Sequence, residues 1–325
     1  MTNPILKSVC LKGEQAILEW STSHDPKPGD HDVVIEVHAV GVNWLDTFRE
    51  PGSDPHSFPG LEASGYIKQR GSKVSRVQVG DKVALLAPGG AFTSNLVIHE
   101  NLVMPVDQEV SIYAAAAFLE SAVTAWSNCF FDRKLESGGW LLLHAGASNI
   151  SMWAAQLAKV SGIPTVALVN NDEEHQHAAS ANATEIVRYF DPELIRRIRQ
   201  LSTDAKVARS LNCIGGQSIE VDAAVLSTFG DIRLISTLGG SETHVELGNF
   251  LGKALSLHGS SLSLLDEDTR KELMIDLYQT IFSQRPLSEF NVTVAKIFPK
   301  SQLGQAYEYL LNKERIGKIV VDMIG

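Results

Sequence analysis

The 325-residue sequence predicts an α/β protein, in which a β-rich first region precedes a doubly wound parallel sheet. Short β-branched segments crowd the first hundred residues and are separated by Gly, Pro, Asp and Asn turns. Near Ser111 the composition changes to an alanine-rich stretch, and beyond it strand and helix patterns alternate. Such alternation is typical of parallel strands joined by crossover helices that cover both faces of a sheet.

The individual elements follow from composition and periodicity. In the first region, strands are expected at residues 9–13, 16–20, 32–42, 63–69, 81–87 and 95–100. Residues 111–131 are apolar and contain no Gly or Pro, so they predict one or two buried helices. The strands of the wound sheet are expected at residues 140–146, 165–170, 185–190, 207–216, 232–240 and 255–262, with helices at 150–162 and 173–182. The chain is expected to close with a helix, a strand, a helix and a strand at 266–284, 291–299, 301–314 and 318–324.

Composition and charge exclude several classes of protein. Hydrophobic residues make up 44% and charged residues 20%, as in an ordinary globular chain. The net charge of −10 disfavours nucleic acid or an anionic membrane surface as the main partner. We find no apolar run of membrane-spanning length and no secretory signal pattern, so we expect a soluble, cytoplasmic protein. The three cysteines form no Cys-x-x-Cys pair, which argues against a cysteine zinc site or a disulfide framework.

One strand–turn–helix segment, residues 141–159, has the features of a phosphate-binding loop. A strand leads directly into a turn of small residues and an alanine-rich helix, where backbone N–H groups and the helix dipole would attract an anion. A dinucleotide fingerprint places three glycines here. The matching positions are Gly146, Ser148 and Ser151, so only the first glycine is kept. A purely structural strand–turn–helix is the alternative.

The residue that ends the next strand bears on the choice of dinucleotide. NAD sites carry an acidic residue there, and NADP sites place a basic one nearby. Asn170 occupies this position and lacks the acid that would repel a 2′-phosphate, which favours NADPH. The acidic residues that follow at 172–174 would repel the phosphate unless they point away, so NADH stays open.

Seven segments, in order along the chain, resemble a known family. They are AVGVNWLDTFREPG, FPGLEASGYI, VQVGDKVALLAPGGAFTSNLVIHENLVMPVD, YAAAAFLESAVTAW, HAGASNISMWAAQLAK, LNCIGGQS and AYEYLLNKERIGKIVVDM. The chain resembles the zinc-independent members of the medium-chain dehydrogenase/reductase superfamily, in the quinone oxidoreductase-like branch. The resemblance implies a GroES-like catalytic domain formed by residues 1–122 and 263–325, with a Rossmann domain at 123–262 inserted into it. It also implies a homodimer or homotetramer, and hydride transfer in the cleft between the domains.

The resemblance also implies that zinc is absent. In zinc-dependent relatives the ligands are two cysteines and a histidine, and the matching positions here are Asn43, Leu61 and, less securely, Glu120. A simple ketone needs a Lewis acid on its oxygen, whereas a conjugated acceptor spreads charge into an enolate held by hydrogen-bond donors. Reduction of a quinone or of an activated double bond is therefore favoured over oxidation of an alcohol.

Site residues are transferred from the family position by position. Asn43 and Asp46 are expected near the nicotinamide, with Phe48 on the substrate side and Thr124 close to the ring. Phe48 stands where many quinone reductases carry tyrosine. The expected cofactor-binding residues are Gly146, Ser148, Asn149, Ile150, Ser151, Asn170, Tyr189, Cys213, Gly215, Leu238, Gly239, Gly240, Gly259 and Ser260.

Each assignment has a structural alternative. Asn43 would hold a turn, Asp46 and Glu62 would pair internally, Thr124 would bond within its helix, and Tyr189 would be a packed strand residue. We expect an NAD(P)H-dependent reductase that acts on a small molecule, with water as the proton source. The alternative is a dinucleotide-binding or interaction protein that keeps the fold and has lost catalysis. The missing glycines, Phe48, and Glu174 at a position where NADP-binding relatives often carry lysine suggest this alternative.

Overall fold

The computed structural model describes residues 2–13, 15–24, 26–48, 57–132, 135, 138–201, 206–311 and 315–325. The chain forms two compact units: unit 1 contains Met1–Glu120 and Asp266–Gly325, and unit 2 contains Ser121–Leu265. The domain limits expected from the sequence stay a prediction. Within the described ranges, no helix has the length and apolar character needed to cross a membrane.

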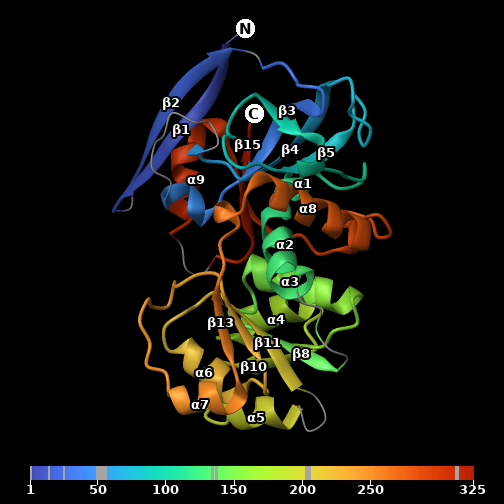
Figure 1. Ribbon diagram of the computed structural model, residues 1–325. Helices are drawn as coiled ribbons and strands as arrows, with labels where there is room; N and C mark the ends of the chain where they lie inside the picture. Colours follow the sequence, from blue (N-terminus) through green and yellow to red (C-terminus); the bar gives the residue numbers. More distant parts are fainter. Residues whose placement is uncertain are drawn as a thin grey trace. The chain divides into compact units, whose positions relative to one another are not determined.

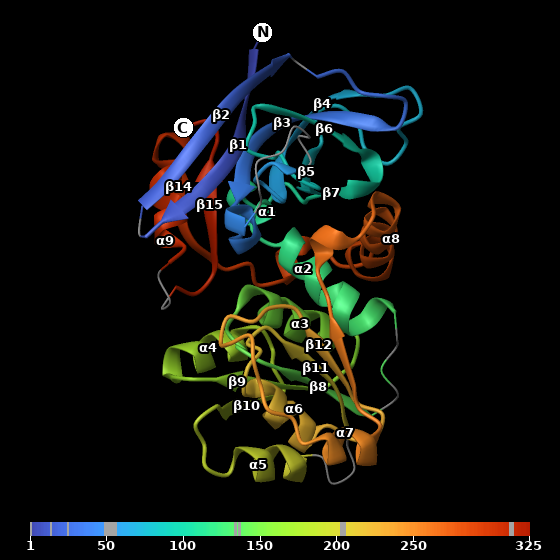
Figure 2. The same ribbon diagram turned by 60° about the vertical axis from the view of Figure 1, so that its left-hand side comes forward.

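Unit 1 is built mostly from antiparallel strands, and only the β14–β15 pair among its described strands is parallel. Its strands are β1 (Thr2–Lys12), β2 (Gln15–His24), β3 (Asp32–Gly41), β4 (Glu62–Arg70), β5 (Lys82–Leu86), β6 (Asn95–His99), β7 (Val103–Pro105), β14 (Val294–Pro299) and β15 (Lys318–Asp322). β1 and β2 form a long hairpin of their own (Figure 2). The others form a sheet in the order β14-β15-β3-β4-β5-β7, with β6 also paired to β3. The sheet therefore joins strands from both ends of the chain, as Val320 opposite Gly41 shows.

Short helices surround the unit 1 sheet. They are η1 (Trp44–Phe48), η3 (Glu100–Leu102), α1 (Ile112–Ala115), α8 (Glu267–Leu277), η6 (Tyr278–Phe282), η7 (Leu287–Glu289), η8 (Lys300–Gln302) and α9 (Leu303–Tyr309). α9 packs against β2, β14 and β15. The helices expected at 266–284 and 301–314 are therefore present, although residues 312–314 lie outside the described part of the chain.

Unit 2 is the predicted doubly wound parallel sheet. Its strands are β8 (Gly139–Leu143), β9 (Thr165–Val169), β10 (Glu185–Arg188), β11 (Lys206–Asn212), β12 (Asp231–Leu234) and β13 (Ser256–Gly259), in the order β10-β9-β8-β11-β12-β13. All five pairings are parallel. Its helices are α3 (Asn149–Val160), α4 (Asp172–Ser180), α5 (Leu194–Leu201), α6 (Ser218–Val225), α7 (Leu247–Lys253) and η5 (Leu262–Leu264), with most of α2 (Leu119–Trp126) and all of η4 (Ser127–Phe131).

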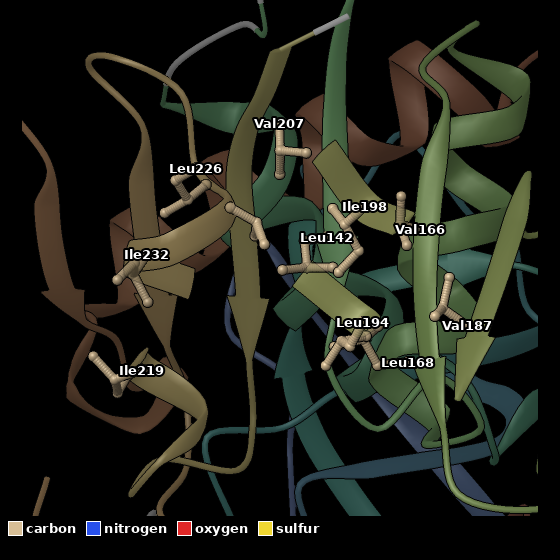
Figure 3. Packing of buried hydrophobic residues seen from close by; sticks show 11 residues of the cluster. Leu142, Val166, Leu168, Val187, Leu194, Ile198, Val207, Ile219, Leu226 and Ile232 are labelled. Carbon is tan, nitrogen blue, oxygen red and sulfur yellow. The ribbon is translucent and has the colours of Figure 1, made fainter. Parts of the chain in front are cut away.

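Side-chain alternation along the strands explains how this sheet is covered on both faces (Figure 1). On β9, Val166 and Leu168 point to a core shared with α5 and α6, as Figure 3 shows for Leu194 and Ile198. Ala167 and Val169 point to the opposite face, where they pack with Ala178 of α4. A strand buried on both faces reads as a continuous apolar run, which is the pattern that predicted it.

All six strands of unit 2 end before the residue that the sequence predicts, as the last three of them show. The strands predicted at 207–216, 232–240 and 255–262 end at Asn212, Leu234 and Gly259. Backbone conformation explains part of this, because Gly215 (φ 68°) and Gly240 (φ 146°), near the ends of the first two of these runs, take values that extended strands do not adopt. These residues form turns at the sheet edge instead.

Candidate functional site

The turn between β8 and α3 is held by one glycine and two serines. A Cβ on Gly146 would lie 2.8 Å from the Cβ of Ala167, so this position needs glycine. Ser148 caps α3 by accepting a hydrogen bond from the Ser151 backbone N–H at 3.3 Å. The buried Ser151 hydroxyl donates to the carbonyl oxygen of His144 at 2.6 Å. Hydrogen bonds from serine thus organise the positions where a dinucleotide fingerprint has glycine.

The start of α3 has the chemistry of an anion site. Asn149 and Ile150 are the first residues of this 12-residue helix, and N–H groups at these positions have no carbonyl partner inside a helix. Both residues are only half-buried, and the helix dipole adds positive potential at this end. The turn therefore fits the pyrophosphate of a dinucleotide, with backbone N–H groups as the donors.

The other expected cofactor residues lie at the carboxyl ends of the remaining strands, which meet at one edge of a parallel sheet. Asn170 follows β9, Tyr189 follows β10, Cys213 and Gly215 follow β11, Leu238, Gly239 and Gly240 follow β12, and Gly259 and Ser260 end β13. Two of these turns are tied together, because the Gly239 N–H donates to the Ile214 carbonyl at 2.7 Å and Gly215 bridges to Gly240. Leu238 is exposed, whereas Cys213 is buried. Burial raises the pKa of the Cys213 thiol to about 11, so it stays neutral.

A buried polar chain lies directly beneath this edge. His144, the residue after β8, contacts the Tyr189 hydroxyl through Nδ1 at 2.9 Å and Asp222 of α6 through Nε2 at 2.7 Å. The other oxygen of Asp222 accepts from Asn212 Nδ2 at 2.6 Å. Asn212 Oδ1 in turn accepts the N–H groups that begin the Gly215 turn. Burial raises the pKa of the Tyr189 phenol, which therefore stays protonated and can donate to His144.

Acidic and basic groups meet at the end of β9. The Glu174 carboxylate accepts the Asn170 backbone N–H at 2.7 Å and its side-chain amide at 3.1 Å. Arg188, the last residue of β10, pairs with Asp172 and donates to the Asn170 carbonyl at 3.4 Å. Two of the acidic side chains at 172–174 are therefore engaged by residues of this chain: Glu174 by Asn170, and Asp172 by Arg188.

In unit 1, Asn43 and Asp46 lie together after β3. One oxygen of the buried Asp46 accepts the Asn43 N–H at 2.9 Å, and the other accepts the Gly60 N–H at 2.8 Å. The Tyr307 hydroxyl is 3.2 Å from the same carboxylate. These bonds fit the structural alternative for Asp46. Phe48, in contrast, leaves 70% of its surface exposed.

A buried ammonium lies beside Asn43. Lys318 Nζ donates to Asn43 Oδ1 at 2.6 Å, to Glu62 Oε1 at 2.5 Å and to Glu120 Oε2 at 3.3 Å. Burial by itself disfavours the charged form, but the two carboxylates outweigh it and raise the pKa of Lys318. The amide of Asn43 is thus oriented by a fixed cation.

Thr124 belongs to α2 in unit 2, so the expected catalytic residues are divided between the units. Its carbonyl accepts from Asn128 Nδ2 at 2.8 Å and from the Ser127 hydroxyl at 3.1 Å. Among the described residues, no group of three or more His, Cys, Asp and Glu side chains is placed to hold a metal ion.

Comparisons with known proteins agree with this architecture. Residues 29–108 match the family model described as alcohol dehydrogenase GroES-like domain, and residues 150–280 match zinc-binding dehydrogenase. The chain is 24% identical over 316 residues to a quinone oxidoreductase of Pseudomonas aeruginosa, covering 95% of this chain and 96% of that protein. It is 25% identical over 299 residues to quinone oxidoreductase 1 of Escherichia coli, covering 89% and 90%.

Solved structures share the fold. An E. coli quinone oxidoreductase complexed with NADPH superposes with a TM-score of 0.79 at 24% identity, covering 98% of this chain and 100% of that one. The CurK enoyl reductase gives 0.78 at 23% identity, covering 98% and 99%. The chain belongs to the medium-chain dehydrogenase/reductase superfamily, in its quinone oxidoreductase-like branch. Both family models describe dehydrogenase domains, and the relatives named above are oxidoreductases.

Within this branch, three groups near the expected site were missed by sequence reasoning. Lys318 begins a short strand with an apolar centre, where a charged residue could have been flagged as a buried ion. His144 stands directly before the glycine turn, which was a weaker signal. For Asp222 the sequence offered none, because α6 lies 78 positions from His144.

Proposed function

We propose that this protein reduces a quinone or the activated double bond of an enone or enoyl compound, without zinc. The observation that carries the proposal is the Gly146–Ser151 turn: its glycine is sterically required and its serines are satisfied by hydrogen bonds at the start of α3. A turn of this kind can hold a dinucleotide although two of three fingerprint glycines are absent.

The bound dinucleotide supplies a hydride, and the chain supplies binding and orientation. The backbone at Asn149 and Ile150 would hold the pyrophosphate, and the His144 chain keeps Tyr189 and the Gly215 turn in place. Asn43 or backbone N–H groups would hold the substrate oxygen as charge develops on it. The proton that completes the reduction would come from water.

The proposed absence of zinc rests on the donor set. Asn43 and Leu61 stand at two of the positions where zinc-dependent relatives have ligands. Lys318 places an ammonium among Asn43, Glu62 and Glu120, and this positive charge would repel a divalent cation. Elemental analysis of the purified protein should find no stoichiometric zinc, and activity should survive a chelator. Zinc at one equivalent, lost together with activity, would contradict this part of the proposal.

NADPH is the proposed hydride donor, with NADH as the alternative. Asn170 carries no charge at the end of β9, which removes the acid typical of NAD sites at that position. Glu174 favours NADH instead, because its carboxylate is held at the same strand end and would repel a 2′-phosphate.

Two titrations test the proposal. NADPH and NADH should quench the fluorescence of the buried Trp126 and Trp153, and 1,4-benzoquinone or trans-2-hexenal should then be turned over. If neither dinucleotide binds at millimolar concentration, the proposed reductase function is wrong.

A second candidate is a dinucleotide-binding protein without catalysis. The observation that favours it is Phe48, which is 70% exposed and offers no hydroxyl where many quinone reductases carry tyrosine. Binding of NADPH with no reduction across a broad panel of quinones and enones would favour this candidate. Turnover of either test substrate would exclude it.

We also propose a homodimer and a cytoplasmic location. β13 is an edge strand of the unit 2 sheet, and Leu257, His258 and Gly259 are exposed along it. An exposed edge strand can pair with a second copy of itself.

A further inference from the structure

Arg188 brings a positive charge to the point where β9 ends. It is the last residue of β10, in register with Val169 of the parallel neighbour β9. Its Nη1 donates to the Asn170 carbonyl at 3.4 Å, and its Nη2 pairs with Asp172. The guanidinium therefore lies at the same sheet edge as the Gly146–Ser151 turn.

This position has a defined meaning in a dinucleotide fold. The end of the second strand receives the adenosine ribose, whose 2′ substituent is the only difference between NADPH and NADH. A guanidinium offers several N–H donors to a phosphate in a fixed planar array. The Arg188 side chain is 47% exposed, so a ligand can reach it.

We propose that Arg188 recognises the 2′-phosphate of NADPH, exchanging its ion pair with Asp172 for the phosphate. The inference rests on the proposed dinucleotide site and names a specificity residue within it. Asp172 is 87% exposed and can turn into solvent, so the exchange leaves its carboxylate hydrated.

Glu174 opposes Arg188 at the same place. Its carboxylate is fixed to the backbone and side-chain amides of Asn170, which also holds the Arg188 contact. A phosphate bound by Arg188 would be repelled by this charge. Removing Arg188 and removing the charge of Glu174 should therefore move the selectivity for the 2′-phosphate in opposite directions.

The test uses two ligands that differ only in the 2′-phosphate: adenosine 2′,5′-bisphosphate and 5′-AMP. Isothermal titration of the full chain gives the dissociation constant of each. Arg188→Ala should raise the constant for the bisphosphate about tenfold, the loss of one charge-assisted contact, and change that for 5′-AMP less than about twofold. Asp172→Asn and Glu174→Gln should each lower the dissociation constant of the bisphosphate and leave that of 5′-AMP unchanged.

Arg196→Ala is the matched control. Arg196 lies in α5, is 61% exposed and pairs with Glu193, so its loss should change neither constant. Thermal melting of each variant checks the fold. Equal binding of the bisphosphate by wild type and Arg188→Ala would overturn the inference while leaving the dinucleotide site intact. Equally weakened binding of both ligands in Arg188→Ala would also overturn it, because Arg188 would then only stabilise the end of the strand. Failure of both ligands and of NADH to bind wild type would refute the proposed function itself.

Discussion

Asp222 is the centre of the polar chain under the unit 2 sheet edge. The side chains of His144 and Asn212 both donate to its fully buried carboxylate. Tyr189 donates to the remaining nitrogen of His144, and Asn212 accepts two backbone N–H groups. A carboxylate in this position is stable only while its donors stay in place.

His144→Phe tests this chain. The ring size is nearly kept, but Asp222 loses one charge-assisted hydrogen bond in a dry environment, so unfolding should become easier by about 2–3 kcal/mol. Tyr189→Phe removes only the outer hydroxyl and should cost about 1 kcal/mol. Urea unfolding followed by circular dichroism measures both. Equal losses in the two variants would mean that Asp222 is not the centre of the chain.

Gly146 allows a second test at the residue scale. In Gly146→Ala the new methyl group would lie 2.8 Å from the Cβ of Ala167 and 3.2 Å from the Leu168 carbonyl. The overpacking should cost about 1–3 kcal/mol and displace the turn, so dinucleotide affinity should fall with stability. Gly248→Ala is the control, because its added Cβ meets nothing within 4 Å and lies in helix α7. Unchanged affinity in Gly146→Ala would show that the turn does not hold the dinucleotide.

At the element scale, a buried ion pair fastens η4 to the sheet. Arg209 of β11 makes hydrogen bonds to both oxygens of Asp231 on β12 and to the carbonyls of Asn128 and Cys129. Burial alone would raise the pKa of Asp231, but the hydrogen bonds from Arg209 and Arg233 lower it below its ordinary value. The folded state thus stabilises the ionised form of Asp231 more than the protonated form.

The lowered pKa predicts an acid-sensitive contribution. A carboxyl group whose pKa is lower in the folded protein than in the unfolded chain stabilises the folded state, fully so at pH values above its unfolded pKa of about 3.9. This stabilisation is lost as the pH falls through the pKa of the folded state. Asp231→Asn should cost about 3–5 kcal/mol at pH 7 and flatten the acid limb of a plot of stability against pH. Asp268→Asn, which changes a 91%-exposed carboxylate, should leave that plot unchanged. An acid limb that stays equally steep in Asp231→Asn would contradict the assignment.

At the scale of the whole molecule, β13 is an edge strand of the unit 2 sheet, where we propose that a second copy pairs. Leu257 is 46% exposed on this edge strand. Leu257→Lys should convert a dimer into a monomer in light scattering, because charged side chains block edge pairing. Val79→Lys, which changes an exposed apolar residue of unit 1, should leave the dimer intact. A wild-type monomer, or a Leu257→Lys dimer, would refute pairing through this edge.

The local pattern of the sequence predicted most strands of both units and the helices α3, α4, α8 and α9, because period and turn chemistry act over a few residues. The apolar runs of β8 and β9 and the alanine-rich α3 follow from neighbours along the chain, whereas the steric need at Gly146 comes from Ala167 and Leu168 of β9. Strand ends were predicted less well, since apolar residues continue into turns that only the glycine backbone angles reveal.

Tertiary packing determined which polar groups of the candidate site contact one another. Lys318 reaches Asn43 across 275 positions, and His144 reaches Asp222 across 78. Each of these bonds exists because two distant elements bury a donor and an acceptor against each other, where an unpaired polar group would be costly. The sequence alone therefore determined the family, the wound sheet and the strand–turn–helix at Gly146, because these depend on local pattern. The folded structure determined which distant polar and charged side chains contact one another, as Lys318 and Asn43 do in unit 1 and His144 and Asp222 do in unit 2.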